Sequence, residues 1–442
     1  MRSITLGASL PLILNIGSTL LGGSGATVPL AQVIRASGYV VSSSLLICGG
    51  IVTYIGSCLL VKACGRTGEA SYEGIARHTL GKNGCRLVQL VIVCNSFGEC
   101  LSILLLFGET LFIGQESETA RKRKVAFAAL ASLPVVCLVR QFHLLAPFSF
   151  ITALGSLTLL AFIVDRTLWT GNHTGPLAIP MEGVVAGDPD NVTTMIEAIA
   201  STAIAMVVQF NVLPAYINLK KRNPAEGEMA TYRVLRWGIG AAVSIYVVTD
   251  VLSYITFGAV DYDTIIEEYL SMWGGPFGVN ALALGQLVSY PLIAHAGVAE
   301  VGKLLQNVAI PSTLRPASWG GASTTERMSE NSSLLAASSL ATPERHAYLC
   351  EVVAGVLWVA ATCSLGLAIS EAGPMLTLTG ACCGLPLMAV FPPLMMLYTK
   401  PEDGATTDPY GPIYKLALAL GTATTAMCAV VSIATYEPGK TG

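Results

Sequence analysis

Two long apolar segments of this chain are interrupted by residues whose backbone and side chains could bind a polar ligand. The first segment, 6–34, is broken by Gly22-Gly23-Ser24-Gly25. The second, 195–219, is broken by Gln209-Phe210-Asn211, with Pro214 three residues on. An interrupted helix leaves N–H and C=O groups without partners, and within a membrane such groups survive only where they line a cavity or are buried in protein. Paired breaks at corresponding positions of two halves indicate the binding site of a secondary transporter.

The chemistry of these breaks suits an amino acid, which presents one carboxylate and one ammonium group. The N-terminal end of a half-helix offers unpaired N–H groups and a partial positive charge. Three of the four residues Gly22, Gly23, Ser24 and Gly25 have no side chain, so a carboxylate can approach their backbone closely. We expect the ammonium group to bind the carbonyls of Val208, Gln209 and Phe210, which the second break, ending at Asn211, leaves without helical partners. The alternative is that the glycines only allow helices to pack closely.

The composition predicts an all-α integral membrane protein. Of the 442 residues, 53% are hydrophobic and 12% are charged, whereas soluble domains are about 25% charged. A spanning helix needs about 20 apolar residues, and the sequence predicts about eleven. Their approximate limits are 6–34, 39–61, 88–113, 125–139, 148–168, 195–219, 236–258, 277–304, 348–370, 374–398 and 414–435. No basic tract with interleaved aromatic residues indicates a nucleic-acid partner.

The distribution of basic residues predicts the sidedness of the loops. Most Lys and Arg residues fall in cytoplasmic loops when the N-terminus is placed inside, and the run 121–124 is the clear exception, with no role assigned. The loop 171–194 then lies outside and carries two glycosylation sequons, at Asn172 and Asn191. The polar stretch from about 306 to 346 has no periodicity, which predicts a disordered cytoplasmic loop.

Ionisable residues deep within the predicted spans are few, and each is costly to bury. Glu99 lies in the third span and His295 in the eighth, and we consider both as candidates for a proton site. The alternative is that each faces an aqueous vestibule or a polar partner between helices. For Asp250, in the seventh span, we prefer this alternative.

Several stretches resemble the amino acid/auxin permease family, which includes the sodium-coupled neutral amino acid transporters. The similar stretches run in the family's order from about residue 10 to residue 435. They include Ser18–Pro29, Glu69–Gly84, Phe210–Lys220, Ser253–Gly258 and Gly380–Gly384. One departure is Ser253, which stands where the family usually has glycine.

The resemblance implies a LeuT-like fold of two inverted five-helix repeats, with helices one and six broken. The repeats would occupy 1–170 and 195–398, with an eleventh helix in 399–442. It also implies a sodium site, because Ser289 resembles the hydroxyl position of the family's site, which carbonyls near Leu20 and Leu21 would complete. The alternative for Ser289 is a hydroxyl bonded back to its own helix.

Together these features predict a secondary-active transporter of amino acids that works by alternating access and is coupled to Na⁺ or H⁺. Neutral substrates are favoured, because Glu99 is the only obvious buried partner for a cationic side chain. We expect no cofactor and no enzymatic activity, since no nucleophile–base pair or metal-ligand cluster is evident. The alternative is a membrane sensor that binds an amino acid without significant flux. The plasma membrane and the vacuolar or lysosomal membrane both stay open, as do the particular amino acid and the oligomeric state.

Overall fold

The structure is a computed structural model, which describes most residues of the chain. The described residues are 12–13, 16–17, 20, 27–111, 117–139, 149–169, 192–222, 224–257, 275–309, 342–369, 372–399 and 408–435. Every regular element within these ranges is helical. Eight described stretches are long and apolar enough to cross a membrane, and Ile151–Asp165 is a shorter apolar helix. The prediction of an all-α, multi-pass integral membrane protein is therefore confirmed. The count of eleven spans and the inverted repeat stay predictions.

The predicted spans from the second to the eleventh lie largely within helices. The helices are α2 (Thr27–Thr67), α3 (Tyr72–Thr110), α4 (Glu118–Leu138), α6 (Ser149–Trp169), α8 (Val192–Ala205), α9 (Gln209–Arg222), α10 (Gly227–Phe257), α12 (Gly275–Ala309), α14 (Thr342–Ala368), α15 (Gly373–Thr379), α16 (Phe391–Tyr398) and α17 (Gly411–Thr435). Helices α3, α4 and α10 begin about 16, 7 and 9 residues before the predicted limits. Two π-helical turns, Gly380–Gly384 and Pro386–Val390, join α15 to α16. We refer to the whole of 373–398 as the central segment.

The structure corrects two predicted boundaries. Helix α2 continues through 35–38, where the sequence predicts a loop between the first two spans. That stretch holds one glycine, Gly38, and no proline, and a glycine costs a helix only about 1 kcal/mol. In addition, α12 extends to Ala309 and α14 begins at Thr342. Both ends of the predicted disordered loop 306–346 are thus helical, and 310–341 lie outside the described residues.

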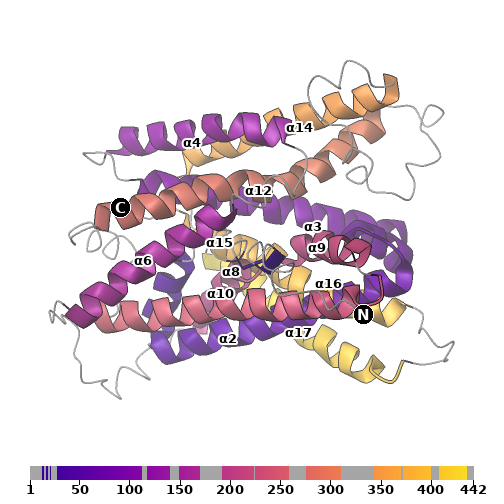
Figure 1. Cartoon of the computed structure of the whole chain (residues 1–442), viewed down its shortest axis with the longest axis horizontal. Coiled ribbons are helices and arrows are strands. Elements are labelled where there is room, and N and C mark those ends of the chain that lie inside the picture. Colours follow the sequence, from indigo (N-terminus) through magenta and orange to yellow (C-terminus); the bar gives the residue numbers. More distant parts are fainter. Residues whose placement is uncertain are drawn as a thin grey trace.

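The long helices run roughly along the longest axis of the molecule (Figure 1). Helices α4 and α14 lie along one edge, α2 and α17 lie toward the other, and α8, α9 and α15 lie between them. Helix α12 packs against α3, α6 and α14, while α2 packs against α10 and α8. The interrupted helix pair α8–α9 is therefore surrounded by other helices.

Helices α3 and α12 are also joined by charge near the beginning of α3 and the end of α12. The Lys303 ammonium lies 2.6 Å from a carboxylate oxygen of Glu73 and 2.6 Å from one of Glu300. The Gln89 amide donates to the other Glu300 oxygen at 2.9 Å. Between these residues α3 changes direction at Gly81, whose φ of 75° is a conformation that glycine adopts without strain.

Glycines let the central segment approach its neighbours backbone to backbone. A Cβ added to Gly380 would overlap the carbonyl oxygen of Ala200 in α8. A Cβ on Gly56 of α2 would likewise overlap the carbonyl oxygen of Met388. Small residues at such crossings allow the close packing that membrane helices use in place of a hydrophobic driving force.

This packing predicts that Gly56→Ala and Gly380→Ala destabilise the protein by about 1–3 kcal/mol, the usual cost of overpacking. The matched control is Gly240→Ala in α10, where an added Cβ meets nothing within 4 Å. Alanine is the better helix former, so the control should be neutral or slightly stabilising. Thermal unfolding of the three variants in detergent checks this, and equal melting temperatures for all three would contradict the packing argument.

Candidate functional site

The break in the sixth predicted span lies at Met206–Val208, where α8 has ended and α9 has not yet begun. The sequence predicts the break at Gln209-Phe210-Asn211, but these residues form the first turn of α9. The reason is local hydrogen bonding. The Gln209 side-chain oxygen accepts the Val208 N–H at 3.0 Å, and the Asn211 N–H donates to the Val208 carbonyl at 2.9 Å. The polar residues therefore begin the second half-helix rather than interrupt it.

Two carbonyls at this break have lost their helical partners. The Met206 carbonyl accepts a hydrogen bond of 2.9 Å from the Thr53 hydroxyl of α2. The Phe210 carbonyl would normally accept from the residue four positions on, which is Pro214, and proline has no N–H. The Phe210 carbonyl thus lacks its usual helical donor, whereas the Val208 carbonyl is already engaged, and the role of these carbonyls in binding an ammonium group stays a prediction.

The Gln209 side chain is buried beside the break and has an unsatisfied hydrogen-bond donor. It is 1% exposed, and its amide nitrogen has no hydrogen-bond partner among the described residues. Leaving a buried donor unsatisfied costs about 1–3 kcal/mol. A ligand oxygen placed beside this nitrogen would remove that cost.

The central segment forms one wall of the site. The Thr53 hydroxyl that holds the Met206 carbonyl also contacts the Met388 sulfur at 3.5 Å. The Tyr72 hydroxyl of α3 donates to the Leu387 carbonyl at 2.8 Å, within the second π-helical turn. π-Helical turns are rare and frequently mark functional sites. The α8–α9 break is therefore held between α2 and a locally irregular helix.

Glu99 lies on α3, beside the central segment. It is 2% exposed, and the Asn95 amide donates to its carboxylate at 2.7 Å. The neighbouring Gly98 packs against Thr379, which places this part of α3 against the central segment. His295 is half-buried on α12, a helix that packs along α3.

Ser289 and the Leu20 carbonyl, two parts of the predicted sodium site, form hydrogen bonds with different partners. The Ser289 hydroxyl donates to the Gly285 carbonyl at 2.9 Å, so the alternative of a bond to its own helix is present. The Thr152 hydroxyl lies 3.0 Å from both of these oxygens, which makes a group of three. The Leu20 carbonyl accepts instead from the Tyr246 hydroxyl of α10.

Asp250 is fully buried between α10 and α2. Its two carboxylate oxygens accept hydrogen bonds of 2.9 Å, one from the Ser42 hydroxyl and one from that of Ser43. The preferred interpretation of Asp250, as a residue with a polar partner between helices, is confirmed.

Other predicted site residues lie outside the described part of the chain. They are Leu21, Gly22, Gly23, Ser24, Gly25, Asn172 and Asn191. Their predicted roles in substrate binding, ion coupling and glycosylation stay predictions.

Sequence reasoning missed the hydroxyl groups that hold this region together. Thr53, Thr152 and Tyr246 are three of several polar residues scattered along largely apolar helices. Thr53 and its partner Met206 are 153 residues apart. Nothing in one sequence signals a contact across such a separation, although a threonine on an otherwise apolar helix is a reason to search for a backbone partner.

Comparison with known proteins places the chain in a family. Residues 13–436 match the family described as transmembrane amino acid transporter protein. Sodium-coupled neutral amino acid transporter 7 of Homo sapiens is 21% identical over 312 residues, which is 67% of this chain and 64% of the relative. Its Xenopus laevis counterpart is 21% identical over 267 residues, or 55% of each chain.

A third relative is solute carrier family 38 member 10 of Mus musculus, 29% identical over 140 residues. That match covers 32% of this chain and 12% of the mouse protein. The chain thus spans less than two thirds of the length of each of these relatives. The family match itself covers nearly the whole chain and bears out the resemblance found in the motifs. The chain belongs to the transmembrane amino acid transporter family.

Proposed function

We propose that the chain is a secondary-active transporter of amino acids, selective for neutral substrates, that works by alternating access. Membership of the family supports amino acid transport. The observation that carries the proposal is the break at Met206–Val208, where a helix is interrupted inside a bundle of membrane helices and the adjoining buried Gln209 amide nitrogen has no partner among the described residues. Non-helical backbone at membrane depth is tolerated only where it is buried in protein or lines a cavity, so this break is a candidate position for the binding site.

The break offers groups of both polarities to an amino acid. The last carbonyls of α8 and the Phe210 carbonyl suit an ammonium group, while the beginning of α9 suits a carboxylate. The Gln209 amide nitrogen adds a buried donor at the same place. In this proposal the carboxylate binds both to the backbone of Gly22–Gly25 and to the Gln209 amide.

The coupling ion is Na⁺ or H⁺. Two relatives are named as sodium-coupled transporters, and the oxygens of Ser289, Thr152 and Gly285 are of the hard type that Na⁺ prefers. A buried carboxylate such as Glu99 suits a proton. A sensor without flux would keep the same break, so a measurement of flux separates the two functions.

Uptake of a labelled mixture of neutral amino acids into proteoliposomes tests the proposal. We expect accumulation under an inward gradient of Na⁺ or of H⁺, and none without a gradient. If Na⁺ drives uptake, Ser289→Ala should raise the Na⁺ concentration needed for half-maximal rate, because one oxygen ligand is lost. Binding of amino acids without accumulation under any gradient would favour the sensor.

The Gln209 amide predicts a specific loss of substrate affinity. A hydrogen bond to a charged group contributes about 1.5–3 kcal/mol, so Gln209→Leu should raise KM by at least about tenfold. The matched control is Gln286→Leu, since Gln286 is also 1% exposed and its amide nitrogen also lacks a described partner. Initial rates in proteoliposomes measure KM for both variants, and an equal change in the two would remove Gln209 from the site.

Glu99 predicts the pH dependence of transport. If the coupling proton binds this carboxylate, Glu99→Gln should abolish the dependence of uptake on external pH. Exchange of internal for external substrate needs no net proton movement and should persist. Asp250→Asn is the matched control, because it removes another buried carboxylate, whose described hydrogen bonds come from Ser42 and Ser43 of α2. Unchanged pH dependence in Glu99→Gln would exclude Glu99 as the proton site.

A further inference from the structure

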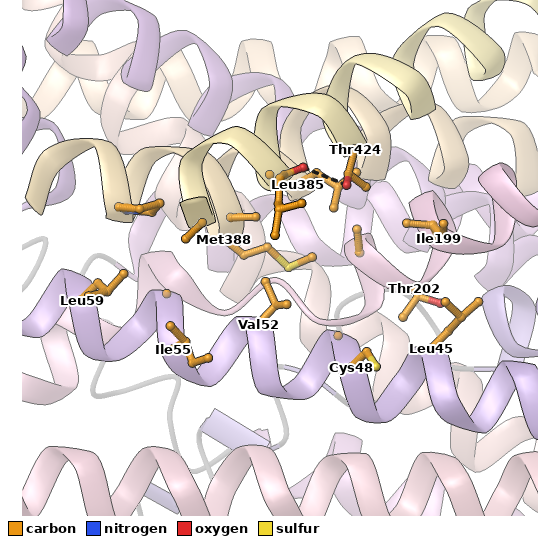
Figure 2. Close-up of a pocket in the computed structure, with 18 residues that line it drawn as sticks. Leu45, Cys48, Val52, Ile55, Leu59, Ile199, Thr202, Leu385, Met388 and Thr424 are labelled. Carbon is orange, nitrogen blue, oxygen red and sulfur yellow. Dashed lines mark hydrogen bonds between the residues drawn. The ribbon is translucent and has the colours of Figure 1, made fainter. Parts of the chain in front are cut away.

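A groove of about 340 Å³ lies along α8, near the α8–α9 break. Its walls come from α2, α8, the central segment and α17. Figure 2 shows Val52 of α2 directed toward Met388 across this space, with Thr424 of α17 at its far side. A cavity of this size is at the lower end of the range for small-ligand sites.

The lining of the groove is almost entirely carbon and sulfur. It includes Leu45, Cys48, Val52, Leu385, Met388 and Leu420. Two hydroxyls also reach it, but Thr202 donates to the Ala198 carbonyl at 2.8 Å and Thr424 to the Leu420 carbonyl at 2.9 Å. Their donors are satisfied within their own helices. The groove therefore suits a hydrocarbon chain better than a polar molecule.

The helices on both sides of the groove face the membrane. On α2, Ile51 and Ile55 are 53% and 49% exposed, and on α17 Leu416 and Leu420 are 61% and 62% exposed. Both helices are apolar enough to span the bilayer. An acyl chain can thus enter the groove sideways from the surrounding lipid and restore dispersion contacts that an empty groove lacks.

One end of the groove carries a positive charge. Lys62 follows the lining residue Leu59 by three positions on α2, which places both on one face. Its ammonium lies 5.5 Å from the ring centroid of Tyr410, just before α17. Arg66, one turn further, donates to Asp408 at 2.8 Å. Tyrosines are enriched at the membrane–water interface, which is where a lipid headgroup lies.

The pair Arg66–Asp408 is neutral as a unit. Partial burial raises the pKa of Asp408, but the hydrogen bonds from Arg66 and the Tyr410 N–H and the charges of Arg66 and Lys62 together outweigh it, and the pKa lies below the ordinary carboxyl value. Asp408 is therefore ionised at neutral pH. The three charges Lys62, Arg66 and Asp408 sum to one positive charge at this end of the groove. The distribution of basic loops predicts that this end faces the cytoplasm, where the leaflet is rich in anionic lipids.

We propose that the groove binds one acyl chain of an anionic phospholipid, with the phosphate beside Lys62 and Tyr410. The acyl chain lies against Val52 and Met388. Since Met388 also contacts the Thr53 hydroxyl that holds the Met206 carbonyl, the lipid supports the wall of the break from outside. The site is separate from the amino acid site and does not depend on the transported substrate.

Photolabelling of the full chain in phosphatidylcholine nanodiscs tests the proposal. The probes are phosphatidylglycerol and phosphatidylcholine with the same diazirine-bearing acyl chain, and mass spectrometry maps the labelled peptides. We expect phosphatidylglycerol to label the groove residues of α2 and α17 in preference to other exposed apolar surface. Lys62→Gln should lower this labelling about fivefold, the contribution of one cation near the membrane surface. Lys62→Arg should retain it.

Two further variants test the acyl chain. Cys48→Phe fills the groove and should abolish the labelling there, whereas Ile47→Phe should preserve it, because Ile47 is 46% exposed on α2 and does not line the groove. Equal labelling of the groove by both lipids would contradict the proposed preference for an anionic headgroup. Undiminished labelling in Cys48→Phe, or labelling spread evenly over the apolar surface, would overturn the site itself. The Lys62 variants at the surface keep the test valid if Cys48→Phe does not fold.

Discussion

The requirement that every backbone polar group find a partner within a membrane governs this structure. Helices satisfy it internally along most of the described residues, and the break between α8 and α9 interrupts this pattern at the centre of the bundle. At the break, the Thr53 hydroxyl donates to the Met206 carbonyl and the Gln209 side chain accepts the Val208 N–H. Met388 of the central segment contacts the same Thr53 hydroxyl. The same requirement makes the break valuable, because groups that the protein does not satisfy are available to a ligand.

Glycines allow the helices around the break to pack closely. Gly56 and Gly380 allow backbone-to-backbone approach of α2 and α8 to the central segment. The π-helical turns then displace carbonyls from their usual partners, and Tyr72 satisfies one of them. The break therefore rests on neighbours that are themselves closely packed, and this packing holds it in one geometry.

The sequence predicted the helical class, most helix positions and the broken sixth span, because apolar length and helix-breaking residues are local properties. It misplaced that break by three residues, since Gln209 can either interrupt a helix or begin one, and only its bond to the Val208 N–H decides. It predicted a loop at 35–38 where α2 continues, because a single glycine is a weak signal. The Thr53–Met206 bond was out of reach, because it depends on how distant helices pack.

The unbroken length of α2 has a mechanical consequence. Its 41 residues make a rod about 60 Å long at 1.5 Å per residue. Along this one rod lie Ser42 and Ser43, bonded to Asp250, then Thr53 at the break, and finally Arg66, bonded to Asp408. A tilt of about 5° displaces one end of such a rod by about 5 Å relative to the other. The three contacts lie on one continuous helix, so a tilt of α2 would shift all three of them together.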